Sequence, residues 1–403
     1  MLRLLRLTLL LSLVLALPAR AGIIFTPRLS EYARLAPGPY DDLSLLHTRI
    51  EKVYDQQGRK TTIGAPLIPS GGQAEIVQLT YKALWVGHPL RDSGIPVLED
   101  HELFCRVIGS LGWQQASSAF VERGRKFGYT SGGSGPGDLF GLCGVYGLEH
   151  RWGAVKFNGL FATTLKFPVG RYERDALLNT GTNYWSTIPQ LALHAELAGR
   201  LYLDATVAWQ FNGDNDAPAY GGLTPTRPAD VRNAEANLAW KFNEHWFADL
   251  GVSHRQSVGR NRYDKVDVHN VEPLEAETAC QTLSLDPTTC SATRQFFLHS
   301  RPGSYADDGV RGTLLTAGLS YVYRSSSVFS LRLLQPVAGR GGQVDVPFDL
   351  YLAVPDVDRP GSFVPAPIPV AQTTTRLNGV QEAASMSASP LIELRLVYLF
   401  WAP

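Results

Sequence analysis

A strict alternation of apolar and polar residues constrains this chain more than any other feature. In the segment LYLDATVAWQFN, residues 201–212, Leu203, Val207 and Trp209 fall on one face and Asp204 falls on the other. A period of two residues is typical of a β-strand with one apolar and one polar side. The alternation recurs along the chain and helical periodicity is scarce, so the sequence predicts an all-β protein.

Twelve segments carry this pattern and are predicted to be strands. They cover residues 43–55, 74–87, 102–113, 138–149, 154–167, 188–198, 201–212, 231–242, 245–256, 311–324, 327–336 and 391–400. Most are long enough to cross a bilayer at a tilt of about 45°. No apolar run after the N-terminal region approaches the roughly 18 residues of a membrane helix.

The links between the predicted strands alternate in length from residue 150 onward. The short links are 150–153, 199–200, 243–244 and 325–326, and the long links are 168–187, 213–230, 257–310 and 337–390. Outer-membrane barrels have short periplasmic turns and long external loops. We therefore predict a transmembrane antiparallel β-barrel of about 12 strands, with the link 88–101 as an unusually long periplasmic connection.

The N-terminus has the three parts of a secretory signal peptide. Arg3 and Arg6 precede an apolar run at residues 7–17, and Ala19-Arg20-Ala21 is a small-x-small cleavage site. The sequence thus predicts a cleaved signal at 1–21 and a protein of the cell outer membrane. Residues 22–40 are expected to be a periplasmic tail or a segment within the lumen, and residues 41–403 the barrel.

Charge and tryptophan placement agree with this interpretation. The full chain has 37 basic and 37 acidic residues, and this near-neutral balance gives no reason to expect nucleic acid as a partner. Tryptophan prefers the headgroup level of a membrane, so two aromatic belts are expected at the strand ends. The periplasmic belt would hold Trp85, Trp152, Trp240, Trp246 and Trp401, and the external belt Trp113, Trp185 and Trp209.

The four cysteines suggest structural bonds and no metal site. Cys280 and Cys290 lie in one long external loop, where we predict a local disulfide that braces a loop without strands of its own. Cys105 and Cys143 lie on consecutive predicted strands and could pair or stay buried as free thiols. The run His101–Cys105 lacks the second histidine of a zinc motif, and we expect neither metal nor cofactor.

The polar faces of the predicted strands should line the lumen. The candidate lumen-facing residues are Lys156, Asn158, Lys166, Gln190, His194, Glu196, Asp204 and Gln210. A porin for ions would be expected to carry a ring of one sign. The charges here are mixed, so they indicate no charge selectivity.

Residues 137–222 carry motifs that resemble those of a known family. A strand runs into Pro168-Val169-Gly170-x-Tyr172, a Leu-Asn-x-Gly-Thr-Asn-x-Trp loop follows at 178–185, and Pro189 begins the next strand. A Phe211-Asn212 turn then precedes Asn215 and Tyr220. The segment is similar to the family of the MetA pathway of phenol degradation, although Val169 and Asp214 replace the threonine and glutamate that this family often has.

The resemblance implies an outer-membrane barrel of the hydrophobe-channel type, similar to fatty-acid and aromatic-hydrocarbon transporters. Such proteins pass apolar molecules passively, so no enzyme activity follows from the family's label. Its external mouth would be built from Asn179, Gly181, Thr182, Asn183, Tyr184, Trp185, Asn212, Asn215 and Tyr220. The expected partners are outer-membrane lipid and lipopolysaccharide, a small apolar ligand and the barrel-assembly machinery.

Three other functions stay open on the sequence. A porin for small polar solutes would use the same fold, a lipase-like barrel enzyme could use the inward His194, and a structural or adhesive barrel needs no particular residue. The loop at 178–186 contains no acid, histidine or cysteine. We therefore expect it to shape the mouth and to anchor Trp185 at the membrane surface more than to contact a ligand.

Overall fold

The computed structural model consists of strands and their connections. It describes residues 35, 37–55, 57–62, 73–88, 102–116, 133–174, 176, 179–218, 225–264, 273–275, 295–300, 304–307, 309–323, 327–341, 343–378 and 388–399. Every regular element in these ranges is a β-strand. Within them, no helix has the length and apolar character needed to cross a bilayer.

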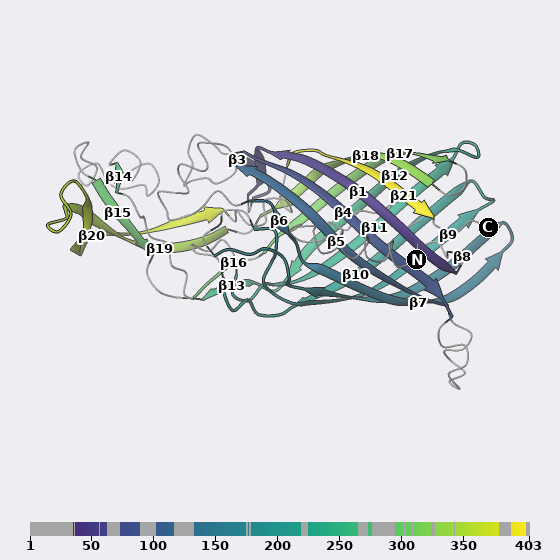
Figure 1. Ribbon diagram of the computed structural model, residues 1–403, viewed down its shortest axis with the longest axis horizontal. Helices are drawn as coiled ribbons and strands as arrows, with labels where there is room; N and C mark the ends of the chain where they lie inside the picture. Colours follow the sequence, from purple (N-terminus) through teal and green to yellow (C-terminus); the bar gives the residue numbers. More distant parts are fainter. Residues whose placement is uncertain are drawn as a thin grey trace, which may run out of the picture.

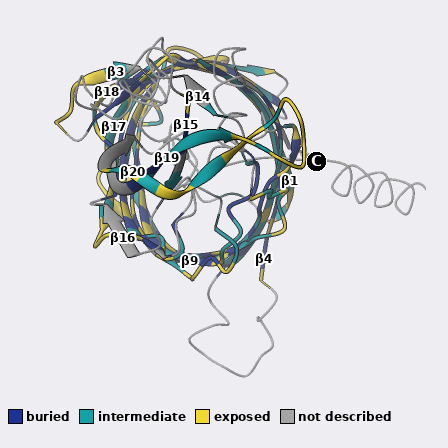
Figure 2. Ribbon diagram, turned by 90° about the vertical axis from the view of Figure 1, so that its left-hand side faces the viewer, coloured by how far each residue is buried: buried dark blue, intermediate teal, exposed yellow. Residues whose placement is uncertain are grey.

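Twelve antiparallel strands form a closed barrel (Figures 1 and 2). They are β1 (Gly38–Ile50), β4 (Ala74–Gly87), β5 (Glu102–Ala116), β7 (Leu139–Trp152), β8 (Val155–Phe167), β9 (Ser186–Leu197), β10 (Leu201–Asn212), β11 (Asp230–Lys241), β12 (Trp246–Val258), β17 (Arg311–Tyr323), β18 (Ser327–Arg340) and β21 (Leu391–Leu399). Each pairs with the strands beside it, and the ring closes because β1 pairs with both β21 and β4. The predicted transmembrane barrel is confirmed.

Exposure alternates along the strands as the sequence pattern predicts. On β10, Leu203 is 40% exposed and its neighbour Asp204 is 1% exposed, which places the leucine on the outer wall and the aspartate inside. All seven tryptophans among the described residues are exposed. They lie toward the strand ends, where an amphipathic ring is stabilised at the headgroup level.

The first strand and one turn differ from the prediction. β1 begins at Gly38 rather than at residue 43, because Asp42 is not a loop residue: inside the barrel it forms ion pairs with Arg395 and Lys82. Beyond Ile50 the chain forms a separate small hairpin. The predicted link 150–153 is shorter, since β7 contains an irregularity between Tyr146 and Glu149 and continues to Trp152.

The predicted long external loops contain strands of their own, which corrects the interpretation of 257–310 and 337–390 as loops without strands. The additional elements are β2 (Lys52–Tyr54), β3 (Lys60–Thr62), β6 (Gly135–Pro136), β13 (Asn261–Asp264), β14 (Leu274–Glu275), β15 (Gln295–Ser300), β16 (Ser304–Asp307), β19 (Gln343–Pro355) and β20 (Phe363–Asn378). β14, β15, β19 and β20 form a four-stranded sheet. This sheet extends beyond the long-loop end of the barrel (Figure 1).

The external sheet has a small apolar core and a proline-rich edge. Phe296, Phe348 and Leu350 are fully buried. The edge strand β20 contains Pro365, Pro367 and Pro369, and its pairing with β19 is irregular along this stretch. Proline lacks the N–H group of a ladder bond, so sheets tolerate it mainly at edges and bulges.

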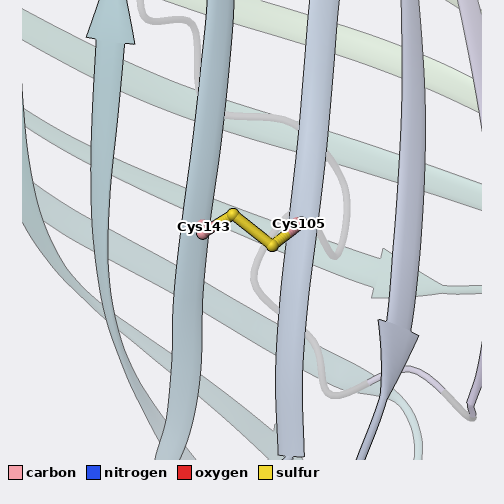
Figure 3. The surroundings of a disulfide bond; sticks show 2 residues. All are labelled: Cys105 and Cys143. Carbon is pink, nitrogen blue, oxygen red and sulfur yellow. A yellow bond between two sulfur atoms is a disulfide. The ribbon is translucent and has the colours of Figure 1, made fainter. Parts of the chain in front are cut away.

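A disulfide bond joins Cys105 on β5 to Cys143 on β7 (Figure 3). These residues are direct partners across the two strands, and Cys143 is exposed on the outer wall. The β5–β7 ladder has seven residue pairs, whereas β4–β5 has fourteen and β7–β8 has twelve. The disulfide therefore reinforces a short seam of the barrel, and it settles the pairing that the sequence left open.

Replacing both Cys105 and Cys143 by serine should lower the free energy of unfolding by about 2–4 kcal/mol, the typical effect of losing a native disulfide. Urea unfolding of the barrel in lipid vesicles, followed by the gel shift between folded and unfolded forms, measures this loss. The matched control replaces Cys280 and Cys290, which leaves the β5–β7 bond intact. An unchanged urea midpoint in the Cys105/Cys143 variant would contradict a stabilising role.

Candidate functional site: the lumen and its external mouth

Part of the inward face of the wall is apolar. Side chains from β4, β5, β7, β8 and β9 form a buried cluster on the inward face of the wall, which we call the apolar strip. Its members are Leu84, Val86, Phe104, Leu142, Tyr146, Leu160, Ala162 and Ala192. The rings of Phe104 and Tyr146 lie 5.1 Å apart, and Leu35 and Tyr40 pack against the strip from the chain before and within β1.

Other strands of the wall carry buried ion pairs. Arg332 on β18 lies 3.0 Å from Asp249 on β12 and 3.5 Å from Glu393 on β21, and all three side chains are buried. Gly318 on β17 lies between Asp249 and Arg332 in the strand register. A side chain at Gly318 would collide with the Asp249 carboxylate. The glycine therefore leaves room for the contact between Asp249 and Arg332.

Two further groups of paired charges lie elsewhere in the wall. Arg395 donates two hydrogen bonds to Asp42, of 3.0 and 2.9 Å, and Lys82 lies 3.4 Å from the same carboxylate. His194 Nδ1 lies 2.6 Å from Asp204, and the imidazole stacks on Tyr202. Positive and negative groups thus compensate one another within the wall and form no ring of one sign.

The structure places the predicted lumen residues on the inward face. Asn158, Lys166, Gln190, His194, Asp204 and Gln210 are buried. Glu196 is half-buried near the short-turn end, and Lys156 is exposed there and pairs with it at 3.8 Å. Lys156 therefore lies at the rim of the lumen rather than within it.

The apolar strip was not predicted, because inward residues were expected to be polar. The segment FGLCGVYGL, residues 140–148, nevertheless signals it, since apolar residues occupy both faces of this strand. A strand that is apolar on both sides must be covered on both sides. Lipid covers one face of β7 and the interior of the barrel covers the other.

At the external mouth, Lys166 holds the 168–185 loop against the barrel. Its ammonium donates a 2.5 Å hydrogen bond to Thr182 Oγ1 and lies 3.4 Å from the centre of the Tyr184 ring. Asp138 lies 3.8 Å from the ammonium and accepts a 3.1 Å hydrogen bond from the Thr182 backbone N–H. These contacts join the start of β7, the end of β8 and the loop that follows.

Asp138 lies just before β7 and is buried. Burial raises the pKa of its carboxyl group above the usual range, while Lys166 and hydrogen bonds from Thr182 and Gly170 oppose that rise. The Gly170 backbone N–H donates a 3.2 Å bond to this carboxylate. Asp138 is therefore the central acceptor of the mouth, and sequence reasoning did not single it out.

The amide side chains of the loop bond to the loop itself. Asn179 accepts from the Glu173 N–H at 2.7 Å and donates to the Glu173 carbonyl at 2.9 Å. Gly181 packs on Gly170 so closely that a β-carbon on either would collide with the other's backbone. Asn183 adopts a left-handed φ of 59° and donates a 2.8 Å bond to Asn215. These residues shape the mouth.

Of the remaining mouth residues, some bond to neighbouring parts of the protein and one lies at the outer surface. Asn212 accepts from Ser186 and donates to the Ala229 carbonyl, and Asn215 is buried. Trp185 is 56% exposed and packs edge-on against Phe167 at 5.0 Å, as a membrane anchor would. Tyr220 and the cysteines at 280 and 290 lie outside the described residues.

The part of the chain that the structure describes contains no group of three or more histidine, cysteine, aspartate or glutamate side chains able to hold a metal ion. The fold and this mouth define a transmembrane β-barrel of the outer-membrane type. The model of the family described as "Putative MetA-pathway of phenol degradation" matches residues 51–276, and the chain belongs to this family.

The fold agrees with that of a solved outer-membrane channel. The COG4313 outer membrane channel from Pseudomonas putida F1 superposes with a TM-score of 0.55 at 14% identity, over 93% of this chain and 100% of that one. The KdgM porin (TM-score 0.34, 7% identity, 90% and 100% covered) and the Pseudomonas putida toluene transporter TodX (0.27, 10%, 94% and 94%) overlap too loosely to support an argument. No curated protein matches the sequence.

Replacing Arg332 by methionine should destabilise the barrel by about 3–5 kcal/mol, because two buried carboxylates lose their partner. Urea unfolding in lipid vesicles measures the change. Adding Asp249→Asn and Glu393→Gln to the same chain should recover most of the loss. A single variant as stable as the wild type would show that the Arg332 pairs do not hold the wall together.

Replacing Asp138 by alanine should release the 168–185 loop, because Thr182, Gly170 and Lys166 all lose an acceptor. Trypsin should then cleave after Arg171 or Arg174 several-fold faster, as followed by mass spectrometry of the folded barrel. Asp216→Ala, in the neighbouring external loop, is the matched control. Equal cleavage rates in the two variants would refute the role of Asp138.

Proposed function

We propose that this protein is a passive outer-membrane channel for small hydrophobic compounds, aromatic ones among them. The observation that carries the proposal is the apolar strip on the inward face of the wall. The interiors of porin barrels are polar and filled with water. The strip instead fills part of the interior with buried leucine, phenylalanine and tyrosine side chains, and burial of apolar area is the main source of affinity for apolar solutes.

The paired charges of the wall support the same function. Arg332, Asp249, Glu393, Asp42 and Arg395 are paired within the wall, so the field they present to a passing ion is small. Membership of the phenol-degradation family fits a role in supplying aromatic compounds to a cell that consumes them. Such consumption maintains the gradient for passive movement.

One described residue of the N-terminal segment lies beside this path. Leu35 belongs to the segment 22–40, and it packs against the apolar strip. We propose that this segment lies within the lumen rather than in the periplasm. Export through a signal peptide at 1–21, insertion by the barrel-assembly machinery and contact with outer-membrane lipid complete the proposed cellular context.

Replacing Leu142 and Leu160 together by asparagine should slow the uptake of toluene into liposomes several-fold, because the path loses apolar surface. Thr164→Ser, also inward on β8, is the matched control and should leave uptake unchanged. The expected result also includes little steady ionic current in planar bilayers. A large, stable conductance, with toluene uptake equal in all variants, would favour the porin for polar solutes.

A lipase-like activity would require a nucleophile beside His194. Among the described residues, the hydrogen-bond partner of His194 is Asp204, and no serine hydroxyl or cysteine thiol donates to the imidazole. We therefore propose a channel without catalytic function. Phospholipid hydrolysis by the purified barrel that is lost in His194→Ala would contradict this.

A further inference from the structure

The outer wall carries three arginines within one register row of five side chains, just below the external loops. In the strand register, Trp209 on β10, Arg232 on β11, Gln256 on β12, Arg311 on β17 and Arg340 on β18 are successive partners. All five side chains are exposed. They share the outward face of the sheet, since inward neighbours such as Val231 are buried. We call them the basic row.

The basic row concentrates guanidinium groups on one face of the sheet. Arg311 and Arg340 are direct partners on adjacent strands, and like charges at such positions repel each other. The row contains no acidic residue. The nearest acid along β11, Asp230, accepts a 2.9 Å hydrogen bond from the Asn212 backbone N–H. Guanidinium groups suit phosphate oxygens in particular, because their planar N–H groups match the phosphate geometry.

An apolar groove of about 480 Å³ lies on the same outer wall, directly below this row. Its outward lining consists of Leu191, Leu193, Ala205, Val207, Ala234, Ala236, Val252 and His254. Val207, Ala234 and His254 occupy the register row next to the basic row on its membrane side. The three alanines lie among larger leucine and valine side chains in this lining.

His254 connects the two features. It lies at the upper edge of the groove, and its Nδ1 lies 2.9 Å from Thr313 Oγ1 on β17, two residues from Arg311. Ionisable side chains within a membrane-spanning segment are costly and usually serve a function. Polar groups above and an apolar groove below together match a molecule with a phosphate headgroup and hydrocarbon chains.

We propose that the basic row and the groove form a binding site for the phosphorylated glycolipid of the outer leaflet. Phosphate groups on its sugar headgroup contact Arg232, Arg311 and Arg340, and one acyl chain fills the groove over Ala205, Ala234 and Ala236. The long-loop end of the barrel faces the outer leaflet, and the three arginines lie near the long-loop ends of their strands. The site rests on the outer-membrane location and does not depend on what passes through the lumen.

Native mass spectrometry of the intact barrel with bisphosphorylated lipid A tests the site. The triple variant Arg232→Gln, Arg311→Gln, Arg340→Gln should bind lipid A at least tenfold more weakly than the wild type. The double variant Arg151→Gln, Arg200→Gln, which removes two exposed arginines at the short-turn end, should bind as the wild type does. The gel shift of the folded barrel confirms that each variant is folded.

Three further measurements separate the alternatives. Dephosphorylated lipid A should bind as weakly to the wild type as lipid A does to the triple variant. Filling the groove by Ala205→Phe with Ala236→Phe should also weaken lipid A, while inorganic phosphate should not compete at equal concentration. Wild-type affinity in the triple variant, or equal binding of phosphatidylglycerol and lipid A, would overturn the proposal.

Discussion

The constraint on which the rest of the structure depends is the backbone's need for hydrogen bonds in a medium that supplies none. In hydrocarbon each unpaired N–H or C=O costs several kcal/mol, so every membrane strand must have a partner on both sides. Pairing of β1 with β21 and with β4 meets this requirement by closing the ring. Closure in turn separates two environments, lipid outside and a narrow interior within, and the alternation of side chains follows from that division.

Polar and charged side chains, which the lipid-facing wall excludes, must then lie in the interior. Charged side chains that point inward are buried, and they are stabilised only when oppositely charged groups meet. Gly318 illustrates how closely the wall is arranged for this, because its missing side chain is the space in which Asp249 reaches Arg332. The apolar strip adds leucine and aromatic side chains to the interior. A lumen with compensated charges and an apolar strip suits solutes that carry little charge.

Much of this fold follows from the sequence, because alternation in segments such as 201–212 depends only on two faces in two environments. Three features did not follow. Asp42 resembled a loop residue, since its partners Arg395 and Lys82 are remote in sequence. The alternation in β19, visible at Val344, Val346, Phe348 and Leu350, was hidden within a region taken for a loop. The role of Asp138 depends on its hydrogen bonds with Thr182, 44 residues away in the sequence, which no local pattern reveals.

The Cys105–Cys143 bond also has a consequence for the order of events during biogenesis. Its sulfur atoms lie on the outer wall, and Cys105 is the register partner of Trp85, near the start of β5. A bond that forms in the periplasm before insertion forms while the chain is still unfolded or partly folded. Oxidation would then bring β5 and β7 into neighbouring positions ahead of the remaining strands. The same bond that strengthens a short seam in the finished barrel would thus select the correct strand pairing early, before the chain enters the membrane.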